Sequence, residues 1–349
     1  MIDLYFDDRH GCRQVSSLSA FCDDNRNGKE MNSTRRMALQ AIGAGALVLA
    51  GNKSGAAPGT LVSTTGPRDS SPFRYCLNMS TIRGQKPTVD QEVEIAAKAG
   101  FNGIEPWIPN LRKFVEDGGK LADLGKKIAD LGLTVDSAIG FAQWIVDDEK
   151  ARANGLEEAK RDMDMLRQIG GTRIAAPPVG AHGGDAPKID LDAAAERYAA
   201  LQKVGDDCGV LPQLEVWGFS KNLSRLGEVA YVAASTGHPQ TLLLLDAYHL
   251  YKGGSDFAGL DLFSDESLQV FHINDYPAAP PREQMNDSHR VYPGDGIAPM
   301  TQILQSLGGK GRSITLSLEL FNPDYWKQDA QEVANTGLAK MKAVVAAEE

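Results

Sequence analysis

Four ionisable residues stand at the ends of successive apolar segments in the second half of the chain: Glu215, Asp246, His272 and Glu319. Any one of them alone could be a structural charge with a buried partner. Three carboxylates directed at one point repel one another, and burying them without a cation costs on the order of several kcal/mol per ion. Two Glu, one Asp and one His form a mostly hard, oxygen-rich donor set. The pattern predicts one divalent metal ion, for which we expect Mn2+, with Mg2+, Co2+, Zn2+ and Fe2+ as alternatives.

Such a site supports proton transfer next to a carbonyl group. A metal that bridges a carbonyl and its neighbouring hydroxyl makes the α proton acidic, and a carboxylate on either face removes or returns that proton. The outcome is isomerisation or epimerisation. If a hydroxyl or glycosyloxy group lies β to the carbonyl, the same chemistry expels it, which gives a dehydratase or lyase.

The elements that position these residues repeat one pattern along the chain. Amphipathic helical segments end at glycines such as Gly100 and Gly132, and one helix opens with a Thr88–Gln91 capping box. Short apolar strands are predicted over 73–79, 103–107, 134–139, 173–176, 211–217, 241–245, 268–273 and 314–320, with a last helix from residue 330. Eight strands alternating with helices predict an α/β protein whose single domain is a (β/α)8 TIM barrel, with functional residues at the carboxyl ends of the strands.

An open, doubly wound sheet is the alternative architecture. It is usually marked by a GxGxxG turn after the first strand, whereas this chain has Asn78-Met79-Ser80-Thr81 there. The barrel is therefore favoured.

Composition restricts the partners. The chain has 349 residues and a net charge of −10, which argues against nucleic acid as a partner, since phosphate backbones are bound by clustered Lys and Arg. The four cysteines form no CxxC pair, so we expect no disulfide framework. The oligomeric state stays open, with a homo-oligomer as one alternative.

The N-terminal region resembles a twin-arginine export signal. Arg35 and Arg36 precede an apolar segment over 41–50 that is about half the ~20 residues of a membrane span, and small residues over 54–57 offer a cleavage site. Ala38 and Gln40 depart from the usual signal, and Met31 is an alternative start. We predict an extension and signal over 1–57, a flexible linker over 58–72 and the barrel over 73–349. The mature protein would then be periplasmic, with no stable membrane span.

Several motifs resemble those of the xylose isomerase-like barrels, which include ketose 3-epimerases, hydroxypyruvate isomerases, inosose dehydratases and apurinic endonucleases. The motifs are LEVWG around Glu215, LLLDAYHLY around Asp246, VFHIND around His272, PGDG at 293–296 and LSLEL around Glu319, and the resemblance covers about residues 74–346. It implies that the partner is a small-molecule carbohydrate substrate and that these four residues bind the metal. It also implies that Glu215 and Glu319 exchange protons with the substrate.

The same resemblance implies that His249 in the DxxH pattern and Arg290 contact substrate, although Arg282 in the long preceding loop is an alternative to Arg290. Strand-end capping is the structural alternative for His249. Trp107 could stack on a sugar face or simply pack, as could Trp144, while Asn78 and His182 are weaker candidates for substrate contact. Lys221 stands where 3-epimerases carry a substrate-binding Glu, which leaves epimerase specificity in doubt.

The composition disfavours other functions on the same fold. An apurinic endonuclease would need many His for three zinc ions and a basic DNA surface, and this acidic chain has six His. Phosphorylated substrates are disfavoured by export and by the absence of a phosphate-binding glycine loop from the sequence. A non-catalytic, exported carbohydrate-binding barrel is the alternative of another class, and solvent proton exchange separates it from an enzyme.

Overall fold

The computed structural model describes residues 72–308 and 314–347. Its strands are β1 (Phe73–Asn78), β2 (Gly103–Glu105), β3 (Thr134–Val135), β4 (Arg173–Ala176), β5 (Leu211–Glu215), β6 (Leu242–Asp246), β7 (Val270–Ile273) and β8 (Ile314–Leu318). All paired neighbours are parallel, in the order β3-β2-β1-β8-β7-β6-β5-β4. The amide of Ala175 in β4 donates a 2.8 Å hydrogen bond to the carbonyl of Ala138 beyond β3, which brings the two outer strands together. The predicted (β/α)8 barrel is confirmed.

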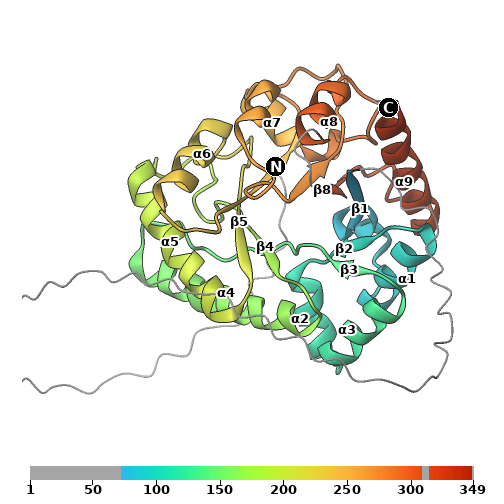
Figure 1. The fold of residues 1–349 in the computed structure, drawn as a ribbon, viewed down its shortest axis with the longest axis horizontal. Helices are drawn as coiled ribbons and strands as arrows, with labels where there is room; N and C mark the ends of the chain where they lie inside the picture. The colour runs from blue at the N-terminus through green and yellow to red at the C-terminus, as the bar shows by residue number, and fades with distance from the viewer. Residues whose placement is uncertain (1–71, 309–313, 348–349) are drawn as a thin grey trace, which may run out of the picture. The chain divides into compact units, whose positions relative to one another are not determined.

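Helices surround the strands (Figure 1). They are η1 (Met79–Gln85), α1 (Val89–Ala99), α2 (Ile108–Glu116), α3 (Leu121–Asp130), α4 (Glu149–Gln168), α5 (Leu191–Cys208), α6 (Leu226–Ser235), α7 (Ala247–Gly253), η2 (Phe257–Leu262), η3 (Asp287–His289), α8 (Met300–Gly308) and α9 (Ala330–Ala346). The last helix, α9, contacts α1 and β1, so the two ends of the barrel sequence pack together.

Local sequence explains these elements. All five residues of β6 are buried, as expected for a strand covered by helices on one face and by the barrel interior on the other. In α3, the buried residues Leu121, Leu124 and Ile128 recur at helical spacing. The predicted capping box at Thr88 is present, and α1 ends at Gly100 with φ +92°, a left-handed conformation that glycine adopts without strain.

The third strand is shorter than predicted. The sequence predicted 134–139, whereas regular pairing stops at Val135. Beyond it, the amide of Asp136 still donates to Ile104, and Ile139 forms an isolated bridge with Trp107. The chain therefore follows β2 without a continuous ladder, because the carbonyl of Ala138 is turned toward β4 instead.

The predicted export signal and nearly all of the linker lie outside the described residues. Cys76 and Cys208 are buried and free. Within the described part of the chain, no helix has both the length and the apolar character needed to cross a membrane.

Candidate active site

Strand register places the predicted metal ligands side by side. Asp246 is the last residue of β6 and stands opposite His272 in β7. His272 in turn stands opposite Ser317 in β8, two residues before Glu319. Because parallel strands end at the same edge of the barrel, one mouth receives all three side chains.

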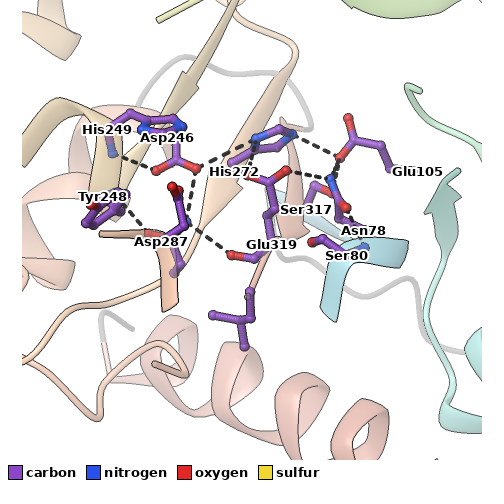
Figure 2. A network of polar contacts seen from close by, with 12 residues as sticks. Asn78, Ser80, Glu105, Asp246, Tyr248, His249, His272, Asp287, Ser317 and Glu319 are labelled. Carbon is purple, nitrogen blue, oxygen red and sulfur yellow. Dashed lines mark hydrogen bonds and ion pairs between the residues drawn. The ribbon is translucent and has the colours of Figure 1, made fainter. Parts of the chain in front are cut away.

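Asp246, His272 and Glu319 converge closely enough to hold one ion. One ligand atom from each lies within 4.8 Å of the others, and all three side chains are buried. Nδ1 of His272 lies 3.1 Å from a Glu319 oxygen and 3.7 Å from an Asp246 oxygen, and Figure 2 shows the imidazole between the two carboxylates and Glu105. Burial alone would raise the pKa of Glu319, but His272 and Arg290 hold it well below its usual range.

Glu215, the fourth predicted ligand, lies outside this close group. It is the last residue of β5 and pairs with Leu244, two residues before Asp246. Its side chain is buried, and its Oε2 has no hydrogen-bond partner in the described chain. Burial, with a further contribution from the charge of Glu319, raises the pKa of Glu215 to about 8. The charges of His272 and Glu319 both act on its pKa, as expected for a residue at the same end of the barrel.

Arg290 lies inside the cluster. Its Nη1 donates to Asp246 at 2.9 Å and to Glu319 at 2.8 Å, and its Nη2 donates to Asp287 and lies 3.0 Å from Nε2 of His249. The side chain is 1% exposed. The alternative, Arg282, is exposed and pairs with Glu283 at 3.5 Å. The structure therefore brings Arg290, and not Arg282, to the predicted ligands, where it acts as a counter-ion for them.

Stacked rings fix the plane of this guanidinium. The carbon Cζ of Arg290 lies 4.7 Å from the centre of the Tyr248 ring and 5.0 Å from that of Phe321. Cation–π contacts of this kind are strongest when they are desolvated, as they are here.

The charge balance of the cluster calls for an additional cation. Arg290 forms ion pairs with three of its buried carboxylates. The buried carboxylates of the cluster are Glu105, Glu215, Asp246, Asp287 and Glu319. Buried charges need compensation, by protons or by a bound ion. Nδ1 of His272 and Oε2 of Glu215 have no hydrogen-bond partner among the residues described. Their donor types and their unsatisfied atoms fit a divalent metal.

Glu105, the last residue of β2, was missed by the sequence reasoning. Its Oε2 accepts hydrogen bonds from Asn78 at 2.9 Å and Ser317 at 2.6 Å and lies 3.0 Å from Nε2 of His272 (Figure 2). A carboxylate on the outer nitrogen of a metal-binding histidine fixes the ring and leaves the other nitrogen to the metal. The rule that found the other four, an ionisable residue at a strand end, would have found Glu105 as well.

The comparison with known proteins agrees with this geometry. Residues 93–344 match the family model described as the xylose isomerase-like TIM barrel. The chain belongs to this family. The resemblance inferred from the motifs is thus confirmed.

Among curated members of the family, inosose isomerase of Bacillus velezensis is 25% identical over 275 residues, covering 78% of this chain and 97% of that protein. L-ribulose 3-epimerase of Mesorhizobium japonicum is 26% identical, covering 64% of this chain and 69% of that protein. A 3-dehydroshikimate dehydratase of Pseudomonas aeruginosa is 23% identical, and the match spans 39% of its length. A solved structure of the IolI protein with a bound zinc atom superposes with a TM-score of 0.73 at 22% identity, covering 79% of this chain and 99% of that one, which shows the shared fold.

His249, three residues after Asp246 in the DxxH pattern, lies against the cluster. Its amide donates to Asp246 Oδ1 at 2.8 Å, which caps α7, and its side chain is buried beside Arg290. Burial, reinforced by the charge of Arg290, lowers the pKa of His249 well below its usual value. The strand-end cap foreseen as the structural alternative is formed by Asp246 and the backbone of His249, and the imidazole takes no part in it.

Asn78 and Trp107 line the β1–β2 side of the mouth. Asn78 Nδ2 donates to Glu105 and, at 3.2 Å, to Glu319, while its Oδ1 accepts from Trp107 Nε1 at 3.0 Å. The Trp107 ring packs against Phe141 and Phe321. Asn78 thus orients a predicted ligand directly, which the sequence had not indicated.

His182 and Trp144 lie away from the cluster. His182 is half-buried with its ring edge-on to Trp217 and Phe219, and Phe219 in turn contacts His249. Trp144 is 1% exposed and donates to the carbonyl of Pro177, so it packs in the core. Lys221 is exposed on the surface. This residue, which replaces the substrate-binding Glu of 3-epimerases, therefore points to solvent.

Proposed function

We propose that the protein is a divalent-metal-dependent sugar isomerase or epimerase that moves a proton next to a carbonyl of a non-phosphorylated sugar or keto sugar. The observation that carries the proposal is the convergence of Asp246, His272 and Glu319 in a buried mouth, with a further buried carboxylate at Glu215. The isomerases and the epimerase among the relatives support the same class of enzyme.

Asp246, His272 and Glu319, with Glu215 as the fourth residue, would hold the ion. We expect Mn2+, and the zinc atom bound by the IolI protein supports a divalent ion in general. When bound, the ion polarises the substrate carbonyl and makes the neighbouring C–H acidic.

Glu215 and Glu319 are prepared for opposite roles. In the metal-free protein, burial raises the pKa of Glu215 to about 8, whereas His272 and Arg290 hold the pKa of Glu319 well below its usual range. Two carboxyl groups whose environments separate their pKa values provide an acid and a base. Glu215 and Glu319 would be the pair of carboxylates that remove and return the α proton, one on either face of the substrate. Arg290, Asn78 and Glu105 hold the ligands in place.

Solvent exchange tests the proposal. Purified protein loaded with Mn2+ is incubated in D2O with a panel of ketoses and 3-keto sugars, and deuterium incorporation at the carbon next to the carbonyl is followed by NMR. We expect exchange with at least one member of the panel. No exchange with any of them would favour the carbohydrate-binding alternative.

Metal content is the second readout. His272→Ala should lower the bound metal, measured by elemental analysis, because it removes the nitrogen ligand. Glu283→Gln, a change at an exposed carboxylate outside the cluster, is the control and should keep full metal content. Full metal content and activity in His272→Ala would mean that the site is misplaced.

A dehydratase or lyase on a keto sugar or oxidised glycoside is the second candidate, favoured by the 3-dehydroshikimate dehydratases among the relatives. It uses the same proton abstraction followed by loss of a β substituent. Loss from the substrate of water, or of the hydroxyl compound released from the glycosidic bond, is seen by mass spectrometry and separates it from isomerisation, which leaves the mass unchanged.

We also propose export through the twin-arginine pathway, on the Arg35-Arg36 motif and the following apolar segment. Arg35→Lys with Arg36→Lys should retain the full-length protein in the cytoplasm of a bacterial host. Unchanged periplasmic delivery would contradict this pathway.

A further inference from the structure

A cavity of about 820 Å³ opens between η1, α1, α2 and the segment that follows β8. Its volume lies within the range of small-molecule sites. None of the four predicted metal ligands lines it. The cavity meets the predicted active site at Trp107, which lines the cavity and donates from its indole to Asn78.

Two indoles form rigid walls. Trp326 donates from Nε1 to the carbonyl of Ser80 at 3.1 Å, which fixes its ring against η1. Gly84 makes this packing possible, because a Cβ at that position would lie 2.2 Å from Trp326. Trp326 is partly buried and offers a flat apolar surface of the kind on which sugar rings pack, whereas the Trp107 ring is covered by the Arg83 guanidinium.

Two cations at this cavity lack a carboxylate partner among the described residues. Of the acidic residues that line it, Asp117 is paired with Lys113 at 2.8 Å and Asp90 with Lys127 at 2.9 Å. Arg83 and Lys86 have no ion pair within the described part of the chain. The Arg83 guanidinium lies over Trp107, 4.5 Å from the ring centre, and is exposed to solvent. These two cations are therefore available to pair with an anionic group of a ligand.

Glu92 supplies a buried polar atom in the cavity wall. Its side chain is 1% exposed, its Oε1 accepts from Asn110 at 2.9 Å, and its Oε2 has no hydrogen-bond partner among the described residues. Both Glu92 and Asn110 line the cavity. A ligand hydroxyl would satisfy the free oxygen, since buried polar groups left without partners are costly.

We propose that this cavity is a second binding site, one for an acidic carbohydrate whose carboxylate pairs with Arg83 and Lys86 and whose ring packs against Trp326. Charged hydrogen bonds hold the carboxylate, and the buried Glu92–Asn110 pair meets ring hydroxyls. Binding at this site does not depend on the proton transfer proposed above, because none of the predicted metal ligands lines the cavity.

Calorimetric titration of the full chain tests the site. The probes are D-glucuronate and D-glucose, which share a ring and differ in the carboxylate. We expect glucuronate to bind at least tenfold more tightly than glucose. Arg83→Met should weaken glucuronate binding at least tenfold, while Lys98→Met, an exposed lysine of α1 outside the cavity, should leave it unchanged.

A parallel variant separates this site from the predicted metal cluster. Glucuronate binding should persist in His272→Ala, whatever that variant does to activity. Should Arg83→Met fail to fold, as judged by circular dichroism, Lys86→Met gives the same readout. The proposal is overturned if glucuronate does not bind, if glucose binds equally well, if the folded cavity variant keeps full affinity, or if His272→Ala abolishes binding.

Discussion

Asp275 and Glu215 are both buried carboxylates near strand ends, but their surroundings differ. Asp275 accepts hydrogen bonds from four backbone amides, those of Tyr276, Gly294, Gly296 and Ala298, at 2.7–3.0 Å. These donors fold the PGDG loop around it. Glu215 has an oxygen without any partner in the described chain, and its neighbours in the mouth are mainly other ionisable groups.

The pKa values express this difference. Burial raises the pKa of Asp275, but its four amide donors limit the rise. Burial and the charge of Glu319 raise that of Glu215 to about 8. A carboxylate satisfied by backbone amides serves the fold, whereas one left in excess among other charges is available for a metal or a proton. On this basis, Asp275 is a structural carboxylate and Glu215 is one that can bind a metal or carry a proton.

The largest expected effect is on catalysis. Glu319→Gln and Glu215→Gln should each lower the rate of proton exchange by about 10²- to 10⁴-fold, because a glutamine cannot carry the proton. Steady-state kinetics and circular dichroism measure rate and folding together. If Glu215→Gln kept wild-type turnover while folded, Glu215 would be a structural carboxylate like Asp275. If Glu319→Gln did so, Glu319 would have no part in proton transfer.

Glu92 tests whether a buried carboxylate with few hydrogen-bond donors has a raised pKa. Burial raises its pKa from 4.5 to about 7, so the folded state holds this proton more tightly than the unfolded state. The stability of the wild type is therefore full below pH 4.5 and falls as the pH rises through 7. Glu92→Gln should be more stable than wild type at pH 8 by at most about 3 kcal/mol and nearly equal at pH 4.5. Urea unfolding at both pH values measures this; equal curves at pH 8 would contradict it.

Glu105 should act through His272. Glu105→Gln should weaken metal binding about 10- to 100-fold, as expected when the partner of a metal-binding histidine is lost. Metal titration against a competing chelator measures the affinity. Asp275→Asn is the matched control, a buried carboxylate changed to an amide outside the cluster, and it should keep the affinity. Equal losses in both variants would point to a general structural effect.

The smallest expected effect is on stability at Asp275. Asp275→Asn places an amide donor against the backbone amides of Gly294 and Gly296 or leaves them unsatisfied, which should cost about 1–3 kcal/mol. Urea unfolding at pH 7 measures the loss, and turnover per folded molecule should stay unchanged. A loss of turnover in the folded variant would give Asp275 a role in the active site.

Much of the barrel could be predicted because its information is local. Apolar runs such as the one ending at Asp246 mark strands, and glycines such as Gly100 mark helix ends, whatever the rest of the chain does. The boundaries of β3 could not be predicted, because its residues 136–139 are partnered by backbone groups on two different strands. Strand-end residues could be grouped because parallel strands end at one edge.

The sequence by itself determined the order of strands and helices and the ionisable residues at four strand ends, since both follow from residue type and short-range spacing. Only the tertiary structure decided which of them meet. It placed Glu105 against His272, 167 residues away, seated Arg290 between Asp246 and Glu319, and kept Glu215 outside the closest group. These contacts depend on barrel closure and strand register, which bring distant residues together without leaving a local pattern in the sequence.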